Sequence, residues 1–261
     1  MVRGLDLFKK YFERYSANYV IIGGTACDII LDEAGFVPRA TKDIDIILVV
    51  EALNADFVKQ FWQFIQDGKY EHKEKSADER KYYRFMKPAN EEFPFQIELF
   101  ARKPDVIDFD EHAHLTPIPV DDDLSSLSAI LLNDDFYNYM LKQSVLENGL
   151  HRANIEALIC LKAKAYLEIS ERIANGSKED SKQLRKHKGD VFRLAVMLKQ
   201  NDEFKLPESI KLQLQTFTDT IANDLPGKEL FKEMGLGSVD SKIVLQQILK
   251  SFRLNSNQIS I

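Results

Sequence analysis

The stretch IDIILVV at residues 44–50 constrains the fold more than any other part of the sequence. It is an almost unbroken apolar run rich in β-branched residues, which is typical of a strand buried on both faces. A shorter apolar run at Tyr19–Ile22 predicts a second buried strand. Helices are predicted on either side of this second strand, over Leu5–Tyr15 and from Thr25, as the capping residue, to about Glu33.

Further strands are predicted before residue 150. A helix over Ala55–Gln66 is followed by segments 81–87 and 94–102, which have strand-like composition and flank the turn-prone sequence PANEE. This pattern favours an antiparallel pair. We expect edge strands at 114–120 and 126–132, and an end to the sheet region near residue 150.

The remainder of the chain has the periodicity of helices. Apolar residues recur at spacings of three and four in IEALICLKAKAYLEISERI, from residue 155, and in SKQLRKHKGDVFRLAVMLK, from residue 181. The same period is found in 208–222 and 239–252. We therefore predict an α+β fold with two domains, an α+β domain over residues 1–150 and a helical bundle over 151–261.

The composition is that of a globular protein, because 44% of the residues are hydrophobic and 29% are charged. Apolar runs fall far short of the roughly 20 residues that a membrane-spanning helix needs. The amphipathic first residues lack a signal-peptide core, so we expect a cytoplasmic protein with no membrane partner. The net charge of −6 argues against a broad basic surface that would coat nucleic acid.

Two carboxylates stand at the start of the apolar strand, in the sequence Asp43-Ile44-Asp45. Residues i and i+2 of a strand point to the same face, about 6 to 7 Å apart. Two neighbouring carboxylates repel each other, and a divalent cation such as Mg²⁺ relieves that repulsion. Taken alone, the motif is weak and is more typical of a solvated strand entrance.

A glycine pair follows the Tyr19–Ile22 strand. Gly23 and Gly24 leave no side chain where the backbone could approach a ligand, and the following helix would aim its amide groups at a phosphate. Thr25 adds a hydroxyl. An ordinary tight turn between strand and helix is the alternative, but a phosphate cradle beside a carboxylate pair would form one nucleotide site.

Glu98 is the third acid of interest. In PFQIELFAR the strand alternation places Ile97 and Leu99 on one face and Gln96, Glu98 and Phe100 on the other. An acid in such a strand is costly unless it is paired or bound to metal. The alternative is that this face of the sheet is exposed.

Together these motifs carry a resemblance to a known superfamily. G-G-T, a helix, then R-x-T-x-D-I-D before an apolar strand, and a later strand with one acid, resemble the DNA polymerase beta-type nucleotidyltransferases. The segments IEALICLKAKA (155–165) and KHKGDVFRL (186–194) are similar to helical motifs of the AbiEii-like branch, which is associated with type IV toxin–antitoxin and abortive-infection systems. The gap between Thr25 and Asp43 is longer than in compact members, and the third acid is Glu where Asp is more usual. Both differences leave the number of bound metals open.

The resemblance implies a mixed sheet with flanking helices, and a helical domain that completes the cleft. Gly23, Gly24 and Thr25 would hold the triphosphate of an NTP, and Asp43 and Asp45 would bind Mg²⁺ or Mn²⁺. Glu98 would be the third metal ligand and would help to deprotonate the acceptor hydroxyl. Lys164 and Lys188 would be cations for the phosphates. Asp190 would orient a lysine or the acceptor. Arg39, just before the carboxylates, is a candidate phosphate contact. For SKQLRKHK a solvated helix face is the alternative.

The function implied is a Mg²⁺-dependent nucleotidyltransferase that moves a nucleoside monophosphate from an NTP to an acceptor hydroxyl. The acceptor is open: RNA or protein in a toxin-like role, or a small molecule. An antitoxin protein is a possible partner. The alternative is a non-catalytic NTP-binding or regulatory module with the same fold.

Overall fold

The computed structural model of the chain describes residues 2–72, 84–102, 115–117, 128–178 and 181–255. The chain divides into two compact units. The first contains Met1–Ile29 and Arg39–Asn154, and the second contains Ile30–Pro38 and Ile155–Ile261. Residues 30–38, which the sequence analysis assigned to the first domain, thus group with the helices that follow residue 154.

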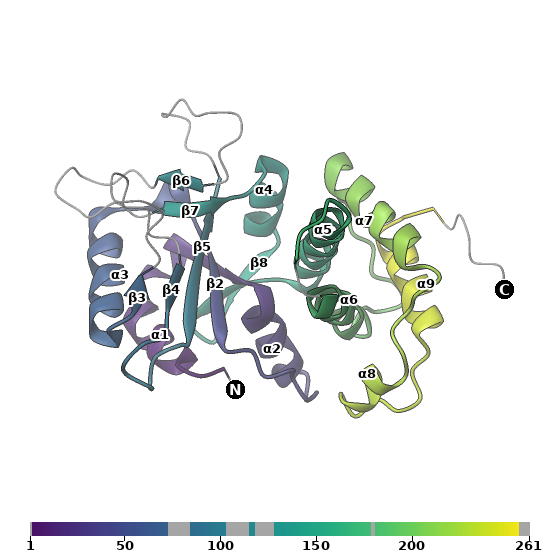
Figure 1. Cartoon of the computed structure of the whole chain (residues 1–261), viewed down its shortest axis with the longest axis horizontal. Coiled ribbons are helices and arrows are strands. Elements are labelled where there is room, and N and C mark those ends of the chain that lie inside the picture. Colours follow the sequence, from purple (N-terminus) through teal and green to yellow (C-terminus); the bar gives the residue numbers. More distant parts are fainter. Residues whose placement is uncertain (1, 73–83, 103–114, 118–127, 179–180, 256–261) are drawn as a thin grey trace. The chain divides into compact units, whose positions relative to one another are not determined.

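The first unit holds a mixed sheet with helices on it (Figure 1). Its helices are α1 (Leu5–Phe12), the first part of α2 (Gly23–Glu33), α3 (Ala55–Gly68) and α4 (Asp134–Lys142), with short 3₁₀ helices at Glu13–Asn18 and Val50–Ala52. Its strands are β1 (Tyr19–Ile22), β2 (Asp43–Leu48), β3 (Glu71–His72), β4 (Arg84–Met86), β5 (Gln96–Ala101), β6 (Leu115–Pro117), β7 (Ser128–Leu131), β8 (Ser144–Glu147) and β9 (Leu150–Ala153).

The strand order across the described sheet is β3-β4-β5-β2-β1-β9-β8, with β7 beside β5 and β6 beside β7. Strands β1 and β2 are antiparallel, whereas β2 is parallel to β5 and β1 is parallel to β9. Strand β4 is antiparallel to β5, as the sequence predicts for segments 81–87 and 94–102 in their described residues. The predicted α+β class, a mixed sheet with flanking helices and a helical region after it, is confirmed.

Helices α1 and α3 pack on one face of this sheet through aromatic side chains. The Phe8 ring of α1 lies 5.3 Å from that of Tyr19 on β1 and 5.8 Å from that of Phe64 on α3, centroid to centroid. Farther along the sheet, Phe61 of α3 lies 5.4 Å from Phe85 on β4. These rings are fully buried, and such burial contributes most of the free energy of folding.

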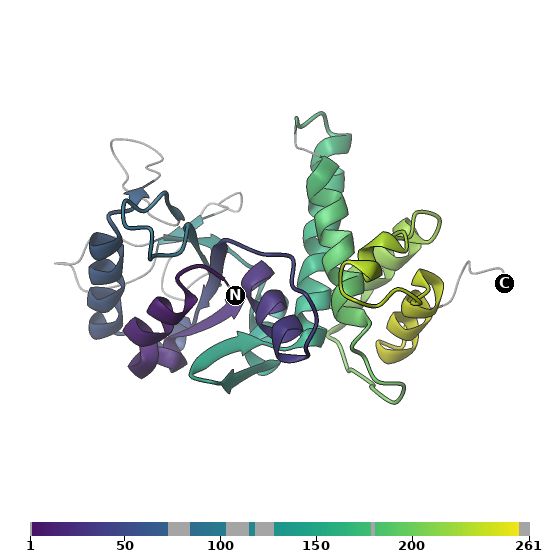
Figure 2. The same cartoon turned by 90° about the horizontal axis from the view of Figure 1, so that it is seen from below.

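The second unit consists mainly of helices, drawn in green and yellow in Figures 1 and 2. They are α5 (Ile155–Ala174), α6 (Ser181–Ala195), α7 (Glu208–Ile221), α8 (Glu229–Lys232) and α9 (Ser241–Ser251). Helix α5 packs against α6 and α7, and α6 also contacts α8 and α9. Within the segments that the structure describes, no helix combines the length and apolar character needed to cross a membrane.

Some elements differ from the sequence predictions. Helix α2 begins at Gly23, so the prediction that Thr25 caps it is wrong. Helix α4 and the β8–β9 hairpin, which turns at Asn148-Gly149, were not predicted. Both central residues of that turn have positive φ, of 50° and 74°, which is the conformation that Asn-Gly favours in two-residue hairpins.

Candidate active site

Three carboxylates share one face of the sheet. Asp43 pairs in register with Gln96, and Asp45 pairs with Glu98 on the parallel neighbour β5. Residues in register on adjacent strands point to the same side, as do residues i and i+2 of one strand. The face is the one opposite α1 and α3, because Ile44 points the other way, to the side on which Tyr19 meets Phe8.

The glycine turn lies directly against this carboxylate pair. Gly23 has φ of +69°, and a Cβ added there would lie 2.0 Å from Oδ2 of Asp45. A side chain at Gly23 would therefore both strain the backbone and collide with the carboxylate. Only glycine fits at position 23, and its lack of a side chain lets the Asp45 carboxylate lie against the N-terminus of α2.

The second glycine faces the loop before β2. A Cβ on Gly24 would lie 2.6 Å from Oγ1 of Thr41 and 3.3 Å from a guanidinium nitrogen of Arg39. That nitrogen donates a 3.3 Å hydrogen bond to Thr41 Oγ1. Thr41 and Arg39, the candidate phosphate contact, therefore lie at the start of α2 beside the glycine pair.

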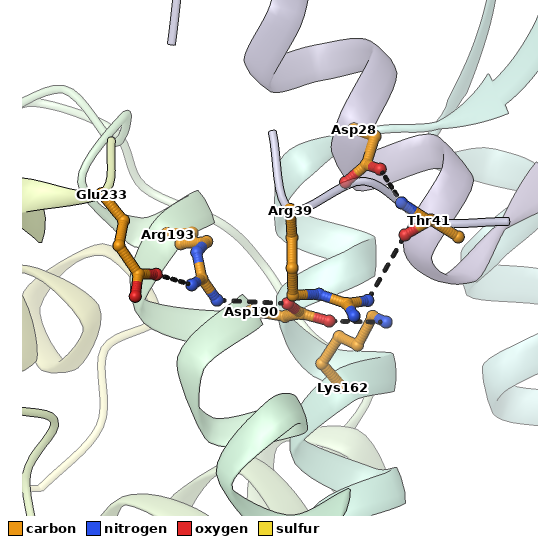
Figure 3. Close-up of polar contacts among 7 residues, drawn as sticks. All are labelled: Asp28, Arg39, Thr41, Lys162, Asp190, Arg193 and Glu233. Carbon is orange, nitrogen blue, oxygen red and sulfur yellow. Dashed lines mark hydrogen bonds and ion pairs between the residues drawn. The ribbon is translucent and has the colours of Figure 1, made fainter. Parts of the chain in front are cut away.

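A buried acid, Asp28, anchors the same loop and was missed by sequence reasoning. Its Oδ2 accepts a 2.6 Å hydrogen bond from the backbone N–H of Thr41 (Figure 3). The preceding residue, Ala40, has φ of +64°, a left-handed conformation that costs a non-glycine residue energy. The Asp28 bond helps to hold it. The available signal was an acid within the apolar run ACDIIL of α2.

Thr25 makes a contact within the fold, and the phosphate contact that the resemblance implies for it stays a prediction. Its side chain is fully buried, and its hydroxyl donates a 2.5 Å hydrogen bond to the backbone carbonyl of Asp43. The bond ties α2 to the first residue of β2. Thr25 therefore positions the carboxylate-bearing strand relative to the glycine turn.

Glu98 forms an ion pair with Arg84. Arg84 on β4 is in register with it, and Arg84 Nε donates a 2.8 Å hydrogen bond to Glu98 Oε1. Glu98 is only 9% exposed, so its charge is compensated in a largely buried setting. Arg84 was not predicted, although its place in the strand-like run at 81–87 offered a signal.

The donor set fits one divalent cation at Asp43 and Asp45. Mg²⁺ is commonly held by one or two carboxylates, with phosphate oxygens of a substrate completing its shell. Both aspartates are partly exposed and share a face beside the glycine turn. In the described part of the chain, however, no three His, Cys, Asp or Glu side chains gather closely enough to hold a metal ion. The three-acid metal site therefore stays a prediction.

Asp190, one of the predicted residues of the helical unit, forms ion pairs with two basic residues of the same unit that were not predicted. Asp190 on α6 is buried, and its Oδ2 lies 3.0 Å from Nζ of Lys162 on α5. Its Oδ1 lies 3.6 Å from a guanidinium nitrogen of Arg193, whose other nitrogen lies 2.9 Å from Oε2 of Glu233 (Figure 3). Lys162 was missed by the sequence analysis, although a lysine within the apolar run ALICLKA was a usable signal.

The two lysines named from the sequence also have partners in this unit. Lys164 forms an ion pair with Glu168 one turn along α5. Lys188 Nζ lies 2.6 Å from Oδ2 of Asp224 and donates to the backbone carbonyl of that residue. These contacts stabilise the helical unit, and roles toward a nucleotide stay predictions for Lys164, Lys188 and Asp190.

Comparison with known proteins gives weak likenesses in fold. No family model matches the sequence, and no curated protein matches it. The polyadenylate synthase of Megavirus is similar over 85% of this chain and 36% of its own, with a TM-score of 0.37 and 9% identity. The chain thus spans about a third of the length of that synthase. JHP933 from Helicobacter pylori is similar over 94% of this chain and 87% of its own, with a TM-score of 0.41 and 11% identity. At these TM-scores neither likeness carries a functional conclusion.

Proposed function

We propose that the protein is a Mg²⁺-dependent nucleotidyltransferase that moves a nucleoside monophosphate from an NTP to an acceptor hydroxyl. The observation that carries the proposal is the contact between the start of α2 and the Asp45 carboxylate, across the space that a Cβ of Gly23 would fill. This contact joins an anion-binding helix terminus to a cation-binding carboxylate pair. A nucleoside triphosphate with its divalent cation needs both.

The residues around this contact have distinct tasks in the proposed reaction. Amide groups at Gly23 and Gly24 would donate hydrogen bonds to phosphate oxygens, and Arg39 would supply a positive charge beside them. Bound at Asp43 and Asp45, Mg²⁺ would supply positive charge opposite the phosphate oxygens. The acceptor hydroxyl would attack the α-phosphorus in line, and pyrophosphate would leave. Thr25 and Asp28 would keep strand, helix and loop in place for this step.

The test is nucleotide transfer by the Asp45→Asn variant. If the cation contributes about 4 kcal/mol to the transition state, transfer of label from an NTP should fall roughly a thousandfold. Without metal, the melting temperature should hold or rise, because one of two repelling carboxylates is lost. Glu92→Gln, which removes an exposed charge elsewhere in the same unit, is the control and should keep full activity. Full activity in Asp45→Asn would exclude the proposal.

A non-catalytic NTP-binding module is the second candidate, and one observation favours it. Glu98, the third acid, already has a counter-ion in Arg84. A binding module would bind NTP in a Mg²⁺-dependent manner and transfer no label to any acceptor. Calorimetry with NTP, run beside the transfer assay, separates the two functions.

The identity of the acceptor and the membership of the AbiEii-like branch are further parts of this proposal. The affiliation is supported only by the sequence motifs at 155–165 and 186–194. The net charge of −6 favours a small molecule or a limited RNA or protein contact over a large nucleic-acid footprint. A screen of labelled NTPs against RNA, protein and small-molecule acceptors, with and without a candidate antitoxin, would identify the acceptor and partner.

A further inference from the structure

A row of charged side chains crosses three strands of the sheet. Register places Arg84 on β4 beside Glu98 on β5, and Glu98 beside Asp45 on β2. Adjacent strands are about 4.8 Å apart, so Arg84 and Asp45 flank Glu98 on opposite sides. The Glu98 carboxylate could in principle serve either neighbour, a cation bound at Asp45 or the guanidinium of Arg84.

In the structure Glu98 contacts Arg84. Nε of Arg84 donates a 2.8 Å bond to Oε1 of Glu98, and a second guanidinium nitrogen contacts the same oxygen. The Arg84 side chain is 32% exposed and that of Glu98 is 12% exposed. Separation of the pair is disfavoured, because the Glu98 carboxylate would be left poorly solvated.

Charge accounting leads to the same arrangement. Asp43 and Asp45 carry two negative charges, which one divalent cation neutralises. Glu98 and Arg84 neutralise each other. If Glu98 joined the metal, the metal group would have a surplus negative charge and Arg84 would lose the carboxylate that it contacts.

We infer that Arg84 confines divalent-cation binding to Asp43 and Asp45, with Glu98 acting as the counter-ion of Arg84 and not as a metal ligand. This inference rests on the proposed function, since it concerns the same cation. Before nucleotide binds, the site holds one cation on two carboxylates. Arg84 is a positioning residue that keeps the third acid turned toward β4.

The test is Mn²⁺ binding, measured by calorimetry and by electron paramagnetic resonance of free Mn²⁺, without nucleotide. The double variant Arg84→Met/Glu98→Met removes the pair with no change in net charge, and its Mn²⁺ affinity should stay within twofold of the wild type at one ion per chain. The single variant Arg84→Met leaves Glu98 without its guanidinium partner beside Asp45, and should bind Mn²⁺ at least threefold more tightly or take up a second ion. The variant Arg84→Lys keeps a positive charge beside Glu98 and, unlike Arg84→Met, should bind Mn²⁺ as the wild type does.

Matched controls separate this effect from a general change in charge. Arg102 forms a similar pair with Glu51, at 2.9 Å, so Arg102→Met removes one positive charge in the same unit and should leave Mn²⁺ binding unchanged. Thermal melts verify folding, and Arg84→Gln/Glu98→Gln replaces the double Met variant if that one does not fold.

Two results would overturn the inference. They are a tenfold or greater loss of Mn²⁺ affinity in the folded double variant, and unchanged binding in Arg84→Met. A failure of the proposed function would give a different result: the Asp45→Asn variant would bind Mn²⁺ with the affinity of the wild type. If Asp45→Asn loses binding while the double variant also loses it, the cation site stands and Glu98 is a ligand.

Discussion

Gly23 and Asp45 define the site at the scale of single residues. Their contact is possible because Gly23 has no Cβ. The loop before β2, which carries Arg39 and Thr41, is held by the buried acid Asp28. Neither role is visible in composition, because both arise from a few ångströms of local geometry.

Gly23→Ala should separate backbone strain from loss of the site. A left-handed alanine costs about 1–2 kcal/mol, so denaturant unfolding should show a decrease in stability of that size or more. Gly35, with φ of +78° and nothing within 4 Å of an added Cβ, provides a control with similar strain and no contact. Both variants should be destabilised, but only Gly23→Ala should lose NTP and Mn²⁺ binding. Equal NTP affinity in the two would place the phosphate cradle elsewhere.

Asp28→Ala should weaken the loop that carries Arg39. Loss of the acceptor for the Thr41 N–H should cost about 1–3 kcal/mol, measured by chemical denaturation. Asp28→Asn keeps an acceptor oxygen and should recover most of that loss. NTP affinity should fall in the alanine variant more than in the asparagine variant, and the opposite order would rule out an anchoring role.

At the scale of elements, hydrogen bonds between segments distant in sequence fix how helices and strands meet. Thr25 ties α2 to β2. Glu51 joins its own 3₁₀ helix to two other segments, since it accepts hydrogen bonds from Tyr137 on α4 at 2.7 Å and from Arg102, which follows β5, at 2.9 Å. Such links decide which faces of the elements come together.

Protonation of Glu51 should lower the stability of the folded protein in acid. Burial raises its pKa, but hydrogen bonds from Tyr137 and Arg102 outweigh burial and hold the pKa below its usual 4.5. The folded state therefore favours the carboxylate, and this contribution is present above pH 4.5 and lost as pH falls through the lower folded value. Melting temperatures of the wild type and Glu51→Gln should differ at pH 7 and converge as the pH falls below the folded pKa of Glu51. A constant difference across that range would contradict the expected linkage.

At the scale of the whole molecule, the two units are each stabilised by their own interior. The first is built around aromatic rings between helices and sheet, and the second around helices joined by the buried Lys162–Asp190 pair. Removing one partner of a buried pair leaves the other charge uncompensated, which is more costly than removing both.

Asp190→Asn should therefore destabilise the helical unit by about 3–5 kcal/mol, and thermal unfolding should show it. The double variant Lys162→Met/Asp190→Asn should recover part of the loss. Lys188→Met, which affects a pair with the 79% exposed side chain of Asp224, should have a smaller effect. An Asp190→Asn protein of wild-type stability but lower NTP affinity would instead support the role implied by the family resemblance.

Much of the fold could be predicted from the sequence because its signals are local. Alternation in DIDIIL and QIELFA reports the two-residue period of a strand, so the shared face of Asp43 and Asp45 follows from the backbone alone. The three-to-four spacing after residue 154 likewise predicts helices. The short hairpin at 144–153 was missed because it contains too few residues for a period to show.

The tertiary structure alone decided which charged groups meet. Glu98 as an acid in a strand could be read from the sequence, but its pairing with Arg84 depends on the register of β4 against β5. In the same way Asp28 meets Thr41, and Lys162 meets Asp190, only after helices, strands and loops have packed. The sequence by itself determined the period and the residue types of each element, because these follow from local backbone geometry. Partners were left to the tertiary structure, because register and packing are set by contacts between segments far apart in the chain.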